Sequence, residues 1–499
     1  MSPSLYPVNV SFLQELMATV AEQGRALLPK ALFAANGEDI VALAKALASG
    51  RGEASGVAIA RQILACYQQL DTAGKRAFFE FLGREMQPDA EAAAEAAAYA
   101  ETPGPDTLSR LQHAVESPRQ EFFRRLNLAP GATQGIVAMR RDLLEIGEGD
   151  PVLALVDGDL KHLFHSWFNR GFLVLRRIDW QTPAAILEKI IAYEAVHAIE
   201  SWDDLRRRLD PKDRRCFAFF HPSLIDEPLI FVEVALTHEI SDAVQPLLTA
   251  PPKDEAIEAP TTAVFYSISN CQDGLKGISF GHFLIKQVVE DLVRELPTLK
   301  TFVTLSPVPG FAQWLAGADG RAVVASLSEE ERNAAGLVKR ARWHTKERAT
   351  QAVRDPLLAL AAHYFLAAKR RDGKPLDAVA RFHLGNGARL ERINFLADVS
   401  DKGLAQAHGV MVNYRYDLKE IEKNHEAYAN QKAVAASRAV RSLLKTADAV
   451  AAKPAGGAEA KAPSVPASSG KGAVSIASRA ALLAIEATGR AGSGKRRDG

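Results

Sequence analysis

A strand that runs directly into closely spaced glycines constrains this chain more than any other segment. Residues 265–269 (FYSIS) have the composition of a strand, residues 270–281 bring the glycines, and residues 282–289 have the pattern of a helix. Glycines at such a junction leave backbone N–H groups open, and the start of the helix adds the positive end of its dipole. The segment therefore predicts a site for a phosphorylated ligand, formed by Lys276, Gly277, Ile278, Ser279, Phe280, Gly281 and His282.

The same glycine loop also fits a second motif. Gly277, Ser279 and Gly281 match the G-x-S-x-G nucleophile elbow of hydrolases, which likewise lies between a strand and a helix. An elbow needs oxyanion donors from an earlier loop, often a histidine followed by glycines, and no His-Gly-Gly run precedes it. We therefore favour the phosphate loop. The alternatives are a nucleophilic Ser279, or glycines that only pack a helix on a sheet.

The second half of the chain contains four further distinctive segments. In chain order they are residues 301–311 (TFVTLSPVPGF), 382–388 (FHLGNGA), 397–400 (ADVS) and 413–416 (NYRY). Together with residues 265–286, they closely resemble malonyl-CoA decarboxylases in sequence, order and separation. The resemblance is strong over about residues 159–428 and weaker before that range, where mainly the helical character is shared.

The resemblance implies a fold. Members of this family have an acetyltransferase-like (GNAT) catalytic domain, in which the pantetheine arm of coenzyme A enters a gap between two neighbouring strands. Residues 264–269 and 301–305 would be these two strands here. Residues 171–178, 215–220 and 229–236 also have strand composition and are interspersed with helical segments, which independently indicates an α/β domain.

The resemblance also implies which residues act. Ser306 and His383 coincide with the family's serine and histidine pair, so His383 is expected to donate a proton and Ser306 to accept or orient one. Taken alone, a single histidine in an apolar run and a serine before a proline are more often structural residues. Weaker candidates for positioning the substrate are Ser267, Asn386 and Tyr416.

Chemistry explains why such a pair suffices to convert malonyl-CoA to acetyl-CoA and carbon dioxide. Loss of carbon dioxide leaves an enolate whose charge lies largely on the thioester oxygen, so the substrate supplies its own electron sink. The protein must hold the carboxylate out of the thioester plane, stabilise the oxyanion and protonate the alpha carbon. No cofactor and no metal are therefore expected, and His162 and His165 have no third ligand nearby in the sequence.

The organisation predicted is α+β with two domains and a tail. Residues 1–158 are alanine-rich and helical in pattern, as in the run 89–99, and predict an all-α bundle. The family resemblance implies that this bundle supports a homo-oligomer, a tetramer. Residues 159–450 form the predicted GNAT-like catalytic domain. Residues 451–499 are rich in Ala, Gly, Pro, Ser and Lys, which predicts a disordered tail.

Composition gives no sign of nucleic-acid or membrane partners. The chain has 61 basic and 60 acidic residues, and 47% of it is hydrophobic without a run long enough to span a bilayer. The basic run at 206–208 is interleaved with aspartates, so we expect a solvated face. Three separated cysteines and an N-terminus without a signal pattern favour the cytoplasm.

Three other functions stay open on the sequence alone. The nearest is a GNAT-type acyltransferase acting on acyl-CoA, followed by a serine thioesterase using Ser279 and by a CoA-binding scaffold without activity. One departure also matters, because better-known members of the family carry glutamate at the position of Ser279. Any catalytic role of that glutamate is therefore either absent from this chain or performed by another residue.

Overall fold

The structure is a computed structural model of the chain, and it describes residues 39–49, 52–249, 259–278 and 284–451, together with Thr19 and Gln23. Side chains are described as far as residue 444. Residues 279–282 of the predicted phosphate loop, and the predicted tail beyond residue 451, lie outside the described residues.

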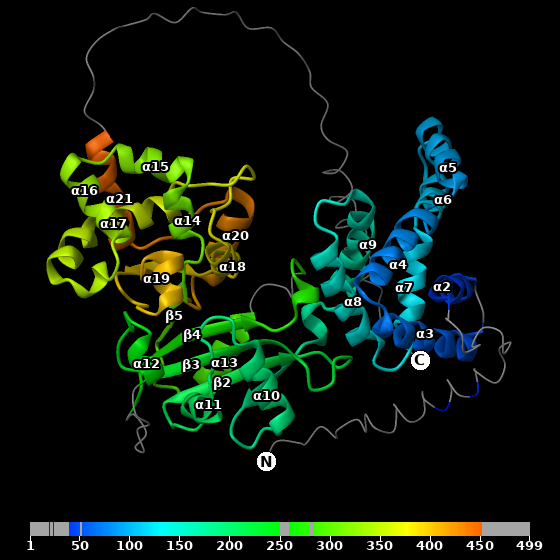
Figure 1. The fold of residues 1–499 in the computed structure, drawn as a ribbon, viewed down its shortest axis with the longest axis horizontal. Helices are drawn as coiled ribbons and strands as arrows, with labels where there is room; N and C mark the ends of the chain where they lie inside the picture. The colour runs from blue at the N-terminus through cyan, green and yellow to red at the C-terminus, as the bar shows by residue number, and fades with distance from the viewer. Residues whose placement is uncertain are drawn as a thin grey trace, which may run out of the picture. The chain divides into compact units, whose positions relative to one another are not determined.

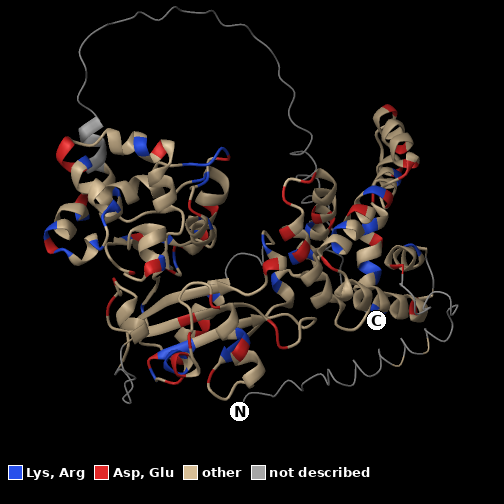
Figure 2. Cartoon of the chain, viewed as in Figure 1, with Lys and Arg blue, Asp and Glu red and all other residues tan. Residues whose placement is uncertain are grey.

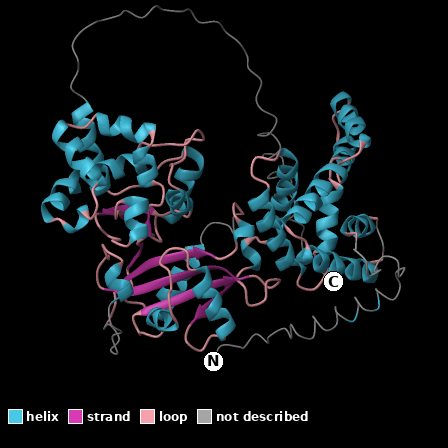
Figure 3. Cartoon of the chain, viewed as in Figure 1, coloured by secondary structure: helices cyan, strands magenta, loops and turns pink. Residues whose placement is uncertain are grey.

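The described part of the chain before residue 170 is helical (Figure 3). Phe78, Phe79, Phe122 and Phe123 lie in its core and are almost completely buried. Asp89 caps the alanine-rich helix at its start by accepting a hydrogen bond from the N–H of residue 91, as short polar side chains do at this position. The helices are α2 (Ile40–Ala48), α3 (Glu53–Gln69), α4 (Thr72–Glu85), α5 (Ala90–Glu101), α6 (Pro105–Ala114), α7 (Pro118–Leu126), α8 (Ala132–Ile146) and α9 (Pro151–Trp167).

One mixed sheet forms the centre of the second half (Figure 1). Its order is β1-β2-β3-β4-β5-β8-β6, with β7 paired to β8, and among these pairs only β4 and β5 run parallel. The strands are β1 (Val174–Ile178), β2 (Arg214–Phe220), β3 (Pro228–Thr237), β4 (Thr262–Asn270), β5 (Thr301–Thr304), β6 (Ser306–Pro307), β7 (Arg389–Asn394) and β8 (Met411–Arg415).

Strands β4 and β5 separate along their length. Their ladder joins residues 262–265 to residues 301–304, and a last bond runs from the Leu305 N–H to the Phe265 carbonyl at 2.8 Å. Beyond that point β4 continues to Asn270 beside β3 without β5. The pair of separating strands that the family resemblance implies is therefore present, and the predicted fold class of a helical region followed by a mixed α/β domain is confirmed.

Helices and short 3-10 turns surround this sheet. The central pair of strands is joined by α13, whose Val288 and Val289 are fully buried in the main core. The α-helices are α10 (Ala184–Tyr193), α11 (Trp202–Leu209), α12 (Gln245–Thr249), α13 (Leu284–Glu295), α14 (Phe311–Ala316), α15 (Ala318–Ala325), α16 (Glu329–Gly336), α17 (Glu347–Leu366), α18 (Ala378–Gly385), α19 (Asp401–Ala407), α20 (Ile421–Gln431) and α21 (Arg438–Ala451). The 3-10 turns are η2 (Arg170–Phe172), η3 (Asp273–Leu275), η4 (Leu337–Lys339) and η5 (Trp343–Thr345).

Charges of both signs are interspersed over the helical region and the sheet domain (Figure 2), as the near-neutral net charge of +1 suggests. The expectation of a solvated basic face on α11 is wrong for Arg208, whose side chain is only 3% exposed. Arg208 pairs with Asp204 and Glu233 and donates to two backbone carbonyls, because a buried guanidinium needs partners for its N–H groups. Among the described residues, no helix has the length and apolar character needed to cross a membrane.

Candidate active site

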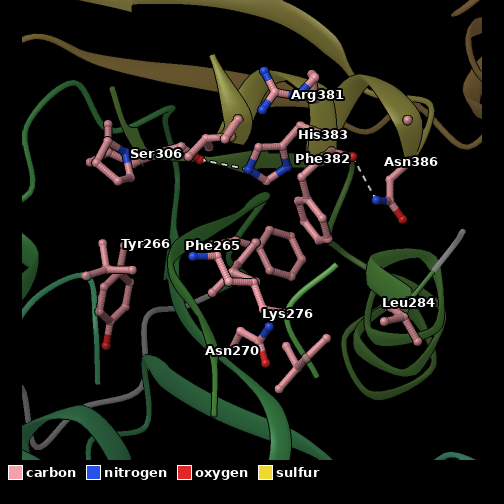
Figure 4. Close-up of a pocket in the computed structure, with 18 of the residues that line it drawn as sticks. Phe265, Tyr266, Asn270, Lys276, Leu284, Ser306, Arg381, Phe382, His383 and Asn386 are labelled. Carbon is pink, nitrogen blue, oxygen red and sulfur yellow. Dashed lines mark hydrogen bonds between the residues drawn. The ribbon is translucent and has the colours of Figure 1, made fainter. Parts of the chain in front are cut away.

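A cavity of about 750 Å³ opens where β4 and β5 separate. Its wall combines residues of β4, the turn after β4, the segment that follows β5 and helix α18, so segments more than 100 residues apart in sequence meet there (Figure 4). The residues lining it include Phe265, Tyr266, Ile268, Asn270, Lys276, Gly277, Ile278, Leu284, Leu305, Ser306, Pro307, Val379, Arg381, Phe382, His383 and Asn386.

Ser306 and His383 contact each other at one end of this cavity. Ser306 Oγ lies 3.0 Å from His383 Nε2, and both residues are almost fully buried. Ser306 also donates a hydrogen bond to Thr304 Oγ1 at 2.8 Å. The predicted pair is therefore in direct hydrogen-bonding contact, although the two residues are 77 positions apart.

Helix α18 presents the histidine to this contact. Asp377 begins the helix by accepting a hydrogen bond from the Ala380 N–H, and His383 follows in its last turn. The imidazole stacks on the Tyr414 ring with centroids 4.4 Å apart, and its Nδ1 lies 2.8 Å from the Tyr416 hydroxyl oxygen. Both tyrosines come from β8 or the residue after it, so the ring is held on one face and along one edge.

Burial keeps this group of side chains neutral. Loss of solvent around the imidazole lowers the pKa of His383 to about 3, because the charged ring would be poorly solvated. Burial likewise raises the pKa of Tyr416 above its usual value. At neutral pH the site therefore holds a neutral imidazole, and each of its two ring nitrogens contacts a neutral hydroxyl group rather than a carboxylate.

The predicted phosphate loop lies at the other end of the cavity, and its described part is Lys276, Gly277 and Ile278 (Figure 4). Gly277 has a φ of +80°, a conformation that costs energy in any residue with a side chain. The other predicted members of the loop, Ser279, Phe280, Gly281 and His282, lie outside the described residues.

A buried arginine of the helical region holds this loop. Arg140 of α8 donates to the carbonyl oxygens of Gly274 at 2.6 Å and of Lys276 at 3.0 Å, and it pairs with Asp157 of α9. A Cβ atom on Gly274 would lie 2.0 Å from the Val137 carbonyl oxygen, so only glycine permits this close approach. The helical region therefore fixes the backbone on which Lys276 and Gly277 lie.

The three weaker candidates have different positions. Tyr416 contacts His383, and Asn386 lines the cavity at the end of α18, where its Nδ2 donates to the Phe382 carbonyl at 2.8 Å. The structure does not bring Ser267 into the cavity: its hydroxyl donates to the carboxylate of Glu194.

A β-bulge explains this position of Ser267. Glu233 of β3 pairs with Ser267, whereas the next residue, Val234, pairs with Phe265, which leaves Tyr266 as an extra residue in β4. An extra residue reverses the alternation of side chains beyond it. Phe265 and Ile268 consequently line the cavity, while Ser267 turns away from it.

Sequence reasoning missed four residues around this site. Thr304, Tyr414, Arg381 and Arg140 contact or line the site or its loop. Thr304 could have been found from the alternation of side chains, because residues two apart on a strand share a face and Thr304 is two residues before Ser306. Nothing in the sequence around Arg140 indicated its contact with the loop, since its partners there lie 134 and 136 positions away in the chain. Within the described ranges, no three His, Cys, Asp or Glu side chains are placed to share a metal ion.

Comparisons with known proteins agree with this geometry. The family model for the malonyl-CoA decarboxylase C-terminal domain matches residues 171–453, and the one for the N-terminal domain matches residues 86–168. The chain belongs to the malonyl-CoA decarboxylase family. The family predicted from the sequence motifs is thus confirmed.

Individual malonyl-CoA decarboxylases show the same relationship. Mitochondrial malonyl-CoA decarboxylase of Mus musculus is 39% identical over 360 residues, which cover 67% of this chain and 73% of the mouse protein. The crystal structure of malonyl-CoA decarboxylase from Rhodopseudomonas palustris has 52% identity and a TM-score of 0.77, and the match covers 82% of this chain and 100% of that one. The structure from Agrobacterium vitis has 54% identity and a TM-score of 0.77, with 81% and 99% covered.

Proposed function

We propose that this protein converts malonyl-CoA to acetyl-CoA and carbon dioxide, with Ser306 and His383 acting on the thioester. The observation that carries the proposal is the 3.0 Å contact between these residues at one end of a cavity of about 750 Å³. Such a volume suits a small organic ligand, and its position between separating strands suits an extended pantetheine arm. Relatives with 37% and 39% identity bear the name malonyl-CoA decarboxylase, which supports the choice of substrate.

The proposed reaction breaks the bond between the alpha carbon and the carboxylate. The electron pair of that bond moves into the thioester, and the oxyanion of the resulting enolate accepts a hydrogen bond from a group at the Ser306 and His383 end. The walls near this end are mostly apolar, including Phe265, Leu305 and Phe382. An apolar wall disfavours the compact charge of the carboxylate more than the spread charge of the enolate, which lowers the barrier.

Proton transfer to the alpha carbon completes the proposed reaction. His383 is the proton donor, and Ser306 orients the carboxylate or passes the proton. The low pKa of about 3 makes His383 a neutral donor through its ring N–H. An enolate carbon is a strong base, so a neutral N–H is an adequate acid, and the Tyr416 hydroxyl at the other ring nitrogen stabilises the negative charge that develops on the ring by hydrogen bonding.

The far end of the cavity has the charge expected of a site for CoA phosphates. Lys276 lies at this end, whereas Arg381, the other cationic lining residue among those described, lies beside His383 (Figure 4), and its guanidinium is oriented by bonds to the carbonyls of Pro375 and Leu376. Asn386 is an uncharged polar group in the same wall. We propose that Lys276 binds phosphate and that Asn386 positions the pantetheine or acyl part.

Product analysis on malonyl-CoA with no acceptor present tests this function. Acetyl-CoA formed together with carbon dioxide is the expected result. Free CoA would indicate a thioesterase, turnover only after an amine is added would indicate an acyltransferase, and CoA binding without any turnover would indicate a scaffold. Ser279→Ala should keep substantial activity. Loss of all turnover with unchanged CoA binding would instead make Ser279 a nucleophile.

Two broader expectations join this proposal. We propose a homo-oligomer, a tetramer by family resemblance, because α5 and α6 pack against each other and bury none of their residues within this chain. Mass photometry of the intact protein and of a variant lacking residues 90–114 tests it, and an unchanged assembly in that variant would remove the role of this hairpin. We also retain the cytoplasm as the compartment, although the mouse relative is named as mitochondrial. Cell fractionation checks that assignment.

A further inference from the structure

Thr304 lies behind the Ser306 and His383 contact and takes no part in the proposed reaction itself. It is the last residue of β5 and is fully buried. Two donors converge on its hydroxyl oxygen: the Ser306 hydroxyl at 2.8 Å and the Tyr414 backbone N–H at 3.1 Å. The first contact follows from the strand geometry, because side chains two residues apart lie on the same face.

This contact decides where the Ser306 proton lies. A serine hydroxyl has one proton, and here it is donated to Thr304. Toward His383 the Ser306 oxygen can therefore offer only a lone pair, so the 3.0 Å contact requires a proton on Nε2. A neutral imidazole carries one N–H, so Nδ1 is an acceptor and the 2.8 Å contact with Tyr416 is a bond donated by the tyrosine.

We propose that Thr304 is a positioning residue that fixes the tautomer of His383 with its proton on Nε2. The chain of donors then runs from Tyr416 through His383 and Ser306 to Thr304. With the acceptor at Thr304 removed, Ser306 donates to Nε2 instead, which is the arrangement of a serine nucleophile beside its base. Thr304 thus selects proton donation by His383 over activation of Ser306.

The backbone at Thr304 is held independently of its hydroxyl group. Its carbonyl oxygen accepts from Asn413 Nδ2 at 2.8 Å, and Asn413 also contacts Arg392 and Asn394. Thr304→Val has nearly the same shape and removes the hydroxyl group, and with it the acceptor for Ser306, whereas Thr304→Ser keeps it. These two variants form a matched pair, although Thr304→Val also leaves the Tyr414 N–H without this partner.

The first test reads the tautomer directly and needs no substrate. Nitrogen-15 NMR of histidine-labelled full-length protein, with His383→Gln to identify the signals, should show a proton on Nε2 in the natural protein and in Thr304→Ser. In Thr304→Val, the proton should move to Nδ1 in a substantial fraction of molecules. An unchanged Nε2 proton in Thr304→Val would overturn the proposal, whatever reaction the protein catalyses.

The second test is kinetic and rests on the proposed function. With malonyl-CoA, Thr304→Val should lower kcat at least about tenfold with little change in KM, and Thr304→Ser should stay within about threefold. Because Thr304 acts through Ser306, Thr304→Val should have almost no further effect in a Ser306→Ala background. Equal losses in both backgrounds would mean a merely structural role for Thr304. Absence of acetyl-CoA from the natural protein would refute the proposed function, while the tautomer result would still stand.

Discussion

The two ends of the cavity differ in their charge and in the region of the chain that supports them. At one end Ser306, His383 and Tyr416 form a buried, neutral series of hydrogen bonds that comes entirely from the sheet domain and its helix α18. At the other end the loop carrying Lys276 is cationic, and Arg140 of the helical region fixes its backbone. The comparison indicates a division of labour in which the neutral end governs the rate and the cationic end governs affinity for CoA.

The strongest test of this division is removal of the pair. General acid–base groups typically contribute about 10²–10⁴-fold in rate, so His383→Ala and Ser306→Ala should each lower kcat within that range. Affinity for CoA, measured by calorimetry, should change little because both residues lie at the opposite end of the cavity from the loop. The double variant should be little worse than the poorer single one, since the residues act as a unit. Fully additive losses with collapsed CoA affinity would contradict this.

Removal of the loop's support should have the opposite signature. Arg140→Met leaves the carbonyls of Gly274 and Lys276 without this donor, and should raise the Kd for CoA on the order of tenfold. At saturating substrate, kcat should stay close to that of the natural protein. Arg141→Met is the matched control, because the neighbouring Arg141 side chain is 49% exposed and pairs with Asp142. A fall in kcat without a change in Kd would break the division.

Tyr414 of β8 and Tyr416 just after it sharpen the comparison within the neutral end. Tyr416→Phe removes the hydroxyl that contacts His383 Nδ1, and should lower kcat about tenfold with unchanged CoA affinity. Tyr414→Phe keeps the stacked ring and removes a buried hydroxyl that has no hydrogen-bond partner among the described residues, so its effect on kcat should be far smaller. Equal effects of the two variants would show that packing, rather than the hydrogen bond, supports His383.

A smaller effect is expected at Gly277. Its φ of +80° would cost a residue with a side chain about 1–2 kcal/mol, although a Cβ there would meet no described atom within 4 Å. Gly277→Ala should therefore weaken CoA binding about fivefold and leave kcat unchanged. Gly336→Ala is the control, because that glycine also has open space but lacks a positive φ. Equal CoA affinities in the two variants would exclude Gly277 from the binding loop.

The pH dependence should show the smallest effect on activity. Because the pKa of His383 is about 3 rather than 6.5, kcat/KM should show no acid limb from this residue between about pH 5.5 and 7.5. The unfolded chain binds this proton more readily than the folded one, so His383 lowers stability as pH falls from 6.5 toward 3, by at most about 1.4 kcal/mol per pH unit. In His383→Gln, the melting temperature should fall less steeply with acid. A kinetic pKa near 6.5 that disappears in this variant would contradict the neutral imidazole.

The sequence predicted the parts of the site that depend on local motifs. The separation of β4 from β5 and the pairing of Ser306 with His383 followed from the family resemblance of their segments, whereas Lys276 followed from the glycine loop itself. Ser267 was a candidate for positioning the substrate, but its hydroxyl contacts Glu194 outside the cavity, because the bulge at Tyr266 reflects pairing with β3, which strand composition does not reveal.

Burial of charge was equally hard to predict. Residues 206–208 are three consecutive arginines, which the sequence alone does not distinguish. The side chains of Arg206 and Arg207 are 57% and 42% exposed, whereas that of Arg208 is buried beside Glu233. Only the packing of α11 on the sheet decides which of them becomes buried. Partners that are distant in the chain determine which charged side chains are buried, and the sequence alone does not identify those partners.

The contact between Arg140 and the loop has a consequence for dissecting this enzyme into fragments. A fragment beginning at residue 171 would retain every residue from Ser306 to Tyr416, but it would lose the guanidinium that binds the carbonyls of Gly274 and Lys276. It would also lose the Val137 backbone against which Gly274 packs. Such a fragment would carry intact chemical groups on a loosened substrate-recognition element, so we expect it to bind CoA more weakly than the full chain does.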